Sequence, residues 1–160
     1  MPIRKVFANA LYKQMVKNKN IFFITGDLGY GIFDNIMKDF PDRAYNTGAA
    51  EQAAVDICIG LALEGKIPIW YSITTFALYR PFESLRTYIN KEKIKVLLVG
   101  SGRDYDYKHD GWSHHSPDAK GFLDLLPNIK QYWPLTTEEI PVMLEEMINQ
   151  PNPSFISLRR

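Results

Sequence analysis

The chain has 160 residues, of which 46% are hydrophobic and 23% are charged, and its formal net charge is +1. This composition is typical of one soluble globular domain spanning residues 1–160, and its charge gives no reason to expect nucleic acid or an anionic membrane as a partner. No apolar run approaches the roughly 20 residues that span a bilayer, and no signal-peptide pattern is evident. The single cysteine, Cys58, excludes an internal disulfide and fits the reducing cytoplasm, and we expect it to be a buried apolar residue.

Helices and strands are predicted to alternate along the chain. Helical spacing of apolar residues covers residues 4–17, and the apolar run 21–25 is typical of a strand that is buried on both faces. Next come a loop (26–31), a helix (32–40), a strand ending near 45 and a helix closing at 65. They are followed by a strand (66–73), a mostly helical segment (74–90) and a strand (94–100). The series ends with a long loop (101–116), a helix (119–126), a strand (129–133), a helix (137–149) and a strand (154–158). This order predicts an α/β fold, with an open, mostly parallel sheet and helices on both faces.

Two local predictions depend on glycine and proline. With Gly48 as the N-cap, Glu51 falls at the third helical position, where an acid ordinarily answers free N–H groups and the helix dipole. Pro81 must lie in the first turn of its helix, since deeper in the helix it would remove a hydrogen bond and clash. Glu51 taken alone therefore has an ordinary structural explanation.

Several polar or aromatic residues directly follow predicted strands. They are Asp27, Glu51, Phe76 and the loop that carries His114. Parallel sheets bind ligands at the carboxyl ends of their strands, so these residues are expected to converge on one edge although they are far apart in sequence.

Four motifs occur in a fixed order, and they are Asn-Thr-Gly-Ala-Ala-Glu-Gln (46–52), Gly-Leu-Ala-Leu-Glu-Gly (60–65), Thr-Phe-Ala-Leu-Tyr-Arg-Pro-Phe (75–82) and Asp-Gly-Trp-Ser-His-His (110–115). This series resembles the pyrimidine-binding (Pyr) domain of transketolase-like thiamine diphosphate enzymes, over most of the chain from about Gly26. The resemblance implies the thiamine diphosphate-binding fold in its Pyr form.

The resemblance gives Glu51 a catalytic role, because the matching glutamate of the family hydrogen-bonds the N1′ nitrogen of the cofactor and promotes formation of the C2 ylid. It also assigns Phe76, Tyr79 and Phe82 to the aromatic cluster around the pyrimidine ring. Their spacing equally permits a core stripe of a helix, and Pro81 departs from the commoner family pattern.

The element at 110–115 resembles the family's Asp-Gly-Pro-Thr-His, with Trp112 and Ser113 replacing proline and threonine. The resemblance implies that Asp110 and His114 contact the substrate hydroxyls or the reacting centre. The three histidines of this loop lack a regular ligand pattern and have no cysteine beside them, so we predict solvated loop histidines here rather than a metal site.

Two further residues match family positions. Asp27 matches an aspartate near the thiazolium side of the cofactor, although a polar strand-end residue is an equal alternative. Arg159 matches an arginine that grips the substrate phosphate, and its alternative is a solvated tail. Gly31 and Gly102 stand near the places where the family usually has the serine and histidine that share this phosphate, which weakens the case for a phosphosugar.

The family binds the cofactor's diphosphate through Mg²⁺ held by a Gly-Asp-Gly run in a separate domain, and this sequence contains no such run. We therefore expect a diphosphate-binding partner chain to supply Mg²⁺ and complete the site, in a homodimer or heterotetramer. The catalytic edge would then carry an exposed apolar and aromatic patch that includes Trp112, Phe76 and Tyr79.

The function that the resemblance implies is transfer of a two-carbon ketol unit, or related carboligation, on a small sugar or 2-oxo acid substrate. One alternative is the β-type subunit of a 2-oxoacid dehydrogenase or decarboxylase. Another is a non-catalytic regulatory paralogue that binds a partner. Two origins of the chain remain possible: a natural split subunit, or a truncation of a longer enzyme.

Overall fold

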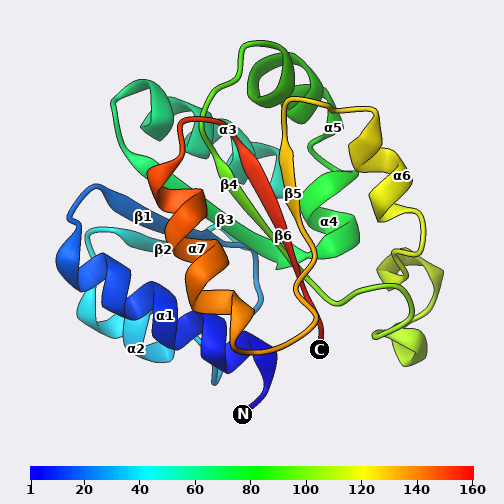
Figure 1. The fold of residues 1–160 in the computed structure, drawn as a ribbon, viewed down its shortest axis with the longest axis horizontal. Helices are drawn as coiled ribbons and strands as arrows, with labels where there is room; N and C mark the ends of the chain where they lie inside the picture. Colours follow the sequence, from blue (N-terminus) through cyan, green and yellow to red (C-terminus); the bar gives the residue numbers. More distant parts are fainter.

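The computed structural model describes residues 1–160 as one six-stranded sheet in the order β2-β1-β3-β4-β6-β5. Every neighbouring pair of strands is parallel. The strands are β1 (Ile21–Thr25), β2 (Ala44–Asn46), β3 (Ile67–Ile73), β4 (Leu97–Ser101), β5 (Lys130–Tyr132) and β6 (Ser154–Leu158). The predicted α/β fold is confirmed, and the sheet is entirely rather than mostly parallel (Figure 1).

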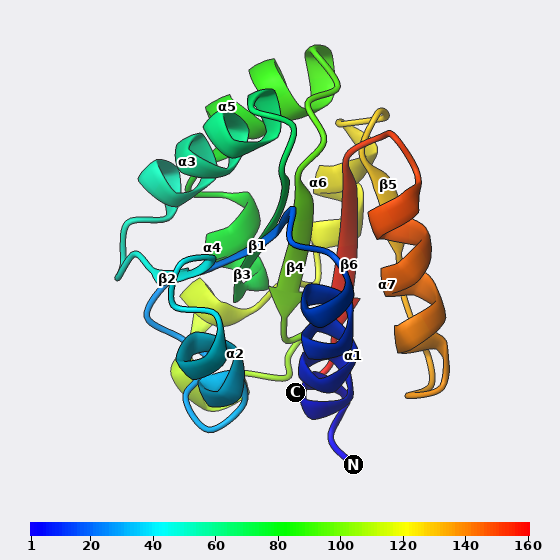
Figure 2. The same cartoon turned by 90° about the vertical axis from the view of Figure 1, so that its left-hand side faces the viewer.

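Helices cover both faces of the sheet, as predicted, and Figure 2 shows α1 and α7 on one side and α3 and α5 on the other. One core lies under α1 (Ile3–Lys17), α2 (Asp34–Asp39) and α7 (Glu139–Asn149). The other core lies under α3 (Glu51–Leu63), α4 (Thr74–Leu78), α5 (Phe82–Ser84), the π-helix η1 (Leu85–Lys91) and α6 (Ala119–Asp124). None of the helices is long and apolar enough to cross a membrane.

The central strands are apolar at successive positions because both of their faces are covered. In β1, Phe23 belongs to the core under α1, whereas Ile24 belongs to the core under α3. In β3, Tyr71 and Trp70 divide between the same two cores. Successive side chains of a strand point to opposite faces, so a continuous apolar run fills two cores at once.

The start of α3 differs from the prediction. Gly48 is not the N-cap: it adopts a φ of +66°, and its N–H donates to Asn46 Oδ1 at 2.9 Å. Ala50 is the N-cap, and Glu51 is the first helical residue rather than the third. The glycine is used to turn the chain after β2, and the helix begins only once that turn is complete.

The segment 74–90 is mostly helical, as predicted, but Pro81 divides it. The helix α4 ends at Leu78, Pro81 is the N-cap of α5, and the chain then continues as the π-helix η1. Proline has no N–H to bond the carbonyl four residues earlier, so it sits between two helices instead of within one. The long loop after β4 contains two short 3₁₀ turns, Lys108–Asp110 and Trp112–His114.

Candidate functional site

A pocket of about 290 Å³ lies at the carboxyl edge of the sheet. Its wall is formed by five segments: the loop after β1, the start of α3, the end of β3, the helix α4 and the loop after β4. The residues that line it are Gly26, Asp27, Leu28, Ala49, Glu51, Ser72, Ile73, Phe76, Arg80 and His114. Four of the residues predicted to converge here, Asp27, Glu51, Phe76 and His114, therefore do lie in one pocket.

Glu51 is the buried carboxylate of this pocket. Only 5% of the residue is exposed, and Oε1 accepts a hydrogen bond from Arg80 Nη1 at 2.6 Å. The turn that precedes it is fixed by Asn46, whose Oδ1 accepts the N–H groups of Gly48 and Asp27 at 2.9 and 3.0 Å. This side chain thus joins the loop after β1 to the start of α3 and sets where Glu51 enters the pocket.

Arg80 is a pocket residue to which the sequence motifs assigned no role. Its guanidinium carbon lies 3.7 Å from the centroid of the Phe76 ring while one of its nitrogens binds Glu51. Residues four apart on a helical segment share a face, so the Phe76–Arg80 spacing was a signal that these side chains could stack. The Arg80 side chain is 46% exposed, which puts it at the mouth of the pocket.

His114 stands on the opposite wall, in a 3₁₀ turn of the loop after β4. Its ring meets Phe76 edge-on with centroids 4.9 Å apart, and its Nδ1 lies 3.0 Å from Ser113 Oγ. The hydroxyl of Thr75 donates to the Ser113 carbonyl at 2.7 Å. The first turn of α4 therefore anchors the loop that brings His114 to the pocket.

Asp27 has an unusual backbone conformation, with φ at +35°. The Tyr30 hydroxyl donates to Asp27 Oδ1 at 2.6 Å, and this bond raises the pKa of Tyr30. Because Asp27 also lines the pocket, the turn after β1 presents a second carboxylate there, opposite the start of α3.

Tyr79 and Phe82 are not brought to this pocket. Their rings pack on Phe122 of α6, with centroids 4.9 and 5.2 Å away, and the Tyr79 hydroxyl donates to Asp118 at 2.8 Å. Burial and the bond to Asp118 raise the pKa of Tyr79. Both side chains therefore pack on α6 instead of lying beside Glu51.

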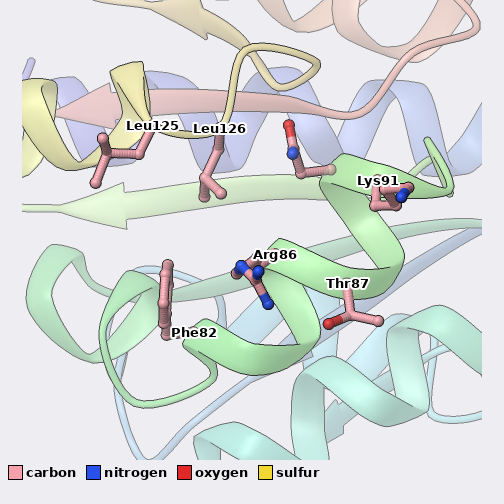
Figure 3. A pocket seen from close by; sticks show the side chains of 7 residues that line it. Phe82, Arg86, Thr87, Lys91, Leu125 and Leu126 are labelled. Carbon is pink, nitrogen blue, oxygen red and sulfur yellow. The ribbon is translucent and has the colours of Figure 1, made fainter.

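Phe82 instead borders a separate hollow of about 520 Å³ between η1 and α6. Figure 3 shows Arg86 and Lys91 on one side of this hollow and Leu125 and Leu126 on the other. No carboxylate lines it, so it offers none of the acid–base groups of the pocket at Glu51.

Asp110 and Arg159 also lie outside the pocket. Asp110 pairs with Arg160 at 3.6 Å, and Arg159 pairs with Asp104 and Asp106 at 3.4 and 3.6 Å. The Arg159 guanidinium is thus held beside two carboxylates of the loop after β4 rather than left open for a phosphate.

The pocket combines a buried hydrogen-bond acceptor, an aromatic wall and an imidazole. That set suits a flat heteroaromatic ring that carries an N–H, because such a ring gains stacking and a charge-assisted hydrogen bond together. No group of three or more His, Cys, Asp and Glu side chains is arranged to hold a metal ion. Cys58 is fully buried, and burial raises its thiol pKa, which disfavours a nucleophilic thiolate.

Comparisons with known proteins identify the family of the chain. The family model described as "Transketolase, pyrimidine binding domain" matches residues 1–160. One of the subunits of an apulose-4-phosphate transketolase of Actinobacillus succinogenes is 31% identical over 122 residues, which are 76% of this chain and 39% of that protein. The 1-deoxy-D-xylulose-5-phosphate synthase of Clostridium kluyveri is 31% identical over 157 residues, 98% of this chain and 25% of that protein. The chain therefore spans less than half the length of these curated relatives.

A solved structure described as a split gene transketolase, inactive beta4 tetramer, superposes with a TM-score of 0.88 at 25% identity. The match covers 100% of this chain and 51% of that one.

Proposed function

The chain belongs to the family of transketolase pyrimidine-binding domains, and from this premise we propose that it forms the pyrimidine half of a thiamine diphosphate site. The main support for this proposal is the buried Glu51 carboxylate at the carboxyl edge of the sheet, beside the Phe76 ring. The reaction proposed is transfer of a two-carbon ketol unit, or related carboligation, on a small sugar or 2-oxo acid.

The residues of the pocket fit an aminopyrimidine ring. Glu51 already accepts an N–H from a planar cation at 2.6 Å, and the Phe76 ring already stacks against that cation. A ring nitrogen that carries a proton would use the same acceptor and the same aromatic wall. Bound thiamine diphosphate supplies a nucleophilic carbon, and Glu51 would hold the ring proton that this chemistry requires.

His114 would serve the substrate side of the same pocket, and Asp27 would lie toward the thiazolium side of the cofactor. A neutral imidazole can donate or accept a proton near neutral pH, and its ring lies against Phe76, next to the proposed ring position. Asp110 pairs with Arg160, and Arg159 pairs with Asp104 and Asp106, so any role for them in substrate binding would require those ion pairs to open.

A partner chain is proposed to hold the diphosphate and Mg²⁺. This chain has neither a Gly-Asp-Gly run nor a group of side chains suited to a metal. The surface of α3 supports a covering partner, because Ala53, Ile57, Gly60 and Leu63 are all exposed on this apolar helix. An adjoining hollow shares Ala49, Glu51 and Arg80 with the pocket, so a chain seated there would also reach the site.

The test is Glu51→Gln, assayed for ketol transfer together with the diphosphate-binding partner. Loss of a positioned acid–base group should lower kcat by about a thousandfold while the fold persists. Glu64→Gln is the matched control, because Glu64 is an exposed carboxylate at the other end of the same helix, and it should retain full activity. An active Glu51→Gln enzyme would remove Glu51 from the proposed mechanism.

A further inference from the structure

Arg80 makes the two contacts that the proposed pyrimidine ring would make. Its Nη1 donates to Glu51 Oε1 at 2.6 Å, and its guanidinium lies flat enough on Phe76 to bring its carbon 3.7 Å from the ring centroid. A guanidinium is planar, positively charged and rich in N–H donors, and a protonated aminopyrimidine has the same three properties.

The arginine and a ring ligand cannot use this position together. A separation of 3.7 Å is van der Waals contact, so no second flat group fits between the guanidinium and Phe76. The Glu51 carboxylate is 6% exposed, and Arg80 is its hydrogen-bond partner in this structure. A ring that takes the same face of Phe76 and the Glu51 oxygen that Arg80 now uses must therefore displace Arg80.

We propose that Arg80 is a displaceable occupant of the pyrimidine position, an internal competitor that lowers the affinity of the pocket for the ring. This inference rests on the proposed function, since it takes the ring position from Glu51 and Phe76. It adds a residue to which no role had been assigned, and it predicts that the pocket alternates between an arginine-filled and a ring-filled form.

The surroundings of Arg80 permit the exchange. Its side chain is 46% exposed and makes no hydrogen bond other than the one to Glu51, so little else holds it in place. A neighbouring hollow of about 450 Å³ gives the guanidinium room to swing outward. Asp56 lines that hollow as well, and its carboxylate offers the displaced cation a second acceptor.

The effect on affinity follows from a two-state equilibrium. A ligand that binds only the open form has its apparent affinity reduced by the fraction of molecules that are open. If Arg80 fills the position in about nine molecules of ten, its removal should tighten ring binding about tenfold.

The experiment is an NMR titration of the full chain with the aminopyrimidine alcohol half of thiamine. This probe lacks the thiazolium charge, which Arg80 would repel for an unrelated reason. We expect Arg80→Ala to bind about tenfold tighter than wild type, and Arg80→Lys to fall between them because lysine keeps the charge but lacks the planar fork. Arg86→Ala is the matched control, because Arg86 is an exposed arginine of the next segment and lies outside the pocket, so its affinity should equal that of wild type.

A second readout follows the arginine itself. The side-chain Nε–H signal of Arg80, assigned by its loss in Arg80→Lys, should shift as the ring displaces it from Glu51. If wild type binds the ring and Arg80→Ala binds it equally or more weakly, the inference is overturned while the proposed function stands. If neither chain binds the ring, both the inference and the proposed pyrimidine position are overturned.

Discussion

Glu51 differs from an ordinary first-turn acid because it is buried. An acid that only answers the free N–H groups of a first turn can remain in water and still do so. Glu51 instead is 5% exposed, and its hydrogen bond goes to Arg80 rather than to a helix N–H. A buried charge is costly unless it is paired, so the arginine accounts for how the carboxylate is tolerated there.

Thr75 is predicted to position His114 through its hydrogen bond to the neighbouring Ser113 carbonyl. Thr75→Val removes the hydrogen bond to the Ser113 carbonyl with little change of shape, and it should destabilise the chain by about 1 kcal/mol in urea unfolding. The amide of His114, which bonds the Gly111 carbonyl, should exchange faster with solvent because the loop is less firmly held.

The matched control for this prediction is Thr87→Val. Thr87 is partly buried on η1 and its hydroxyl makes no hydrogen bond to another residue, so the same substitution should leave both measurements close to wild type. Unchanged exchange at His114 in Thr75→Val would mean that the loop is held by its other contacts.

The positions of three site residues followed from the strands that precede them. Asp27, Glu51 and Phe76 each follow a strand closely, and each lines the pocket. Asp110 lies on the long loop after β4 and pairs with Arg160, while Arg159 directly follows β6 and pairs with carboxylates of that loop. Sequence spacing carries no information on such pairing between distant segments.

At the scale of single elements, Pro81 explains most of what the helix prediction missed. The apolar spacing over 74–90 is real, but the proline divides it, and Tyr79 and Phe82 fall on either side of the break. Both then face α6, where Phe122 receives them. Their family assignment rested on motif spacing, and Pro81, which departs from the commoner family pattern, lies between them.

Glu139 is predicted to make the start of α7 sensitive to acid. Its carboxylate accepts the N–H groups of Thr136 and Leu135, and these bonds lower its pKa below the ordinary 4.5. A lowered folded-state pKa adds stability above pH 4.5 that is lost as the pH falls through the folded value. Glu139→Gln should therefore melt at a lower temperature than wild type at pH 7, with the difference shrinking as the pH falls below 4.5.

Glu145→Gln provides the comparison for this pH series. Glu145 is exposed on the same helix and accepts no hydrogen bond, so its substitution should leave the melting temperature nearly unchanged at both pH values. A Glu139→Gln difference that stays constant with pH would mean that the bonds to Thr136 and Leu135 do not depend on the carboxylate charge.

At the scale of the whole molecule, the alternation of strands and helices was sufficient to predict the layers. Each apolar run such as 21–25 serves two cores, and only a parallel sheet covered on both faces requires that pattern. The order of strands in the sheet and the loop path that brings His114 to Phe76 depend on long-range packing, which a local pattern does not encode.

The outer surface of α3 is where the fold and the proposed assembly meet. Ile57 is 48% exposed there, on a helix that is apolar nearly all round. Helices of that kind are normally covered, and the same helix begins with the Glu51 of the pocket. Trp112, at 71% exposure, also agrees with an apolar surface near this edge, whereas Phe76 and Tyr79 are only partly exposed.

Ile57→Asp is therefore expected to separate folding from assembly. In the isolated chain the side chain lies in solvent, so the melting temperature should change little. In a mixture with the diphosphate-binding partner, a buried unpaired carboxylate should abolish the complex in analytical ultracentrifugation. Val142→Asp is the control, because Val142 is 67% exposed on α7, across the sheet, and its substitution should leave the complex intact. Assembly that survives Ile57→Asp but fails with Val142→Asp would move the partner to the opposite face of the sheet.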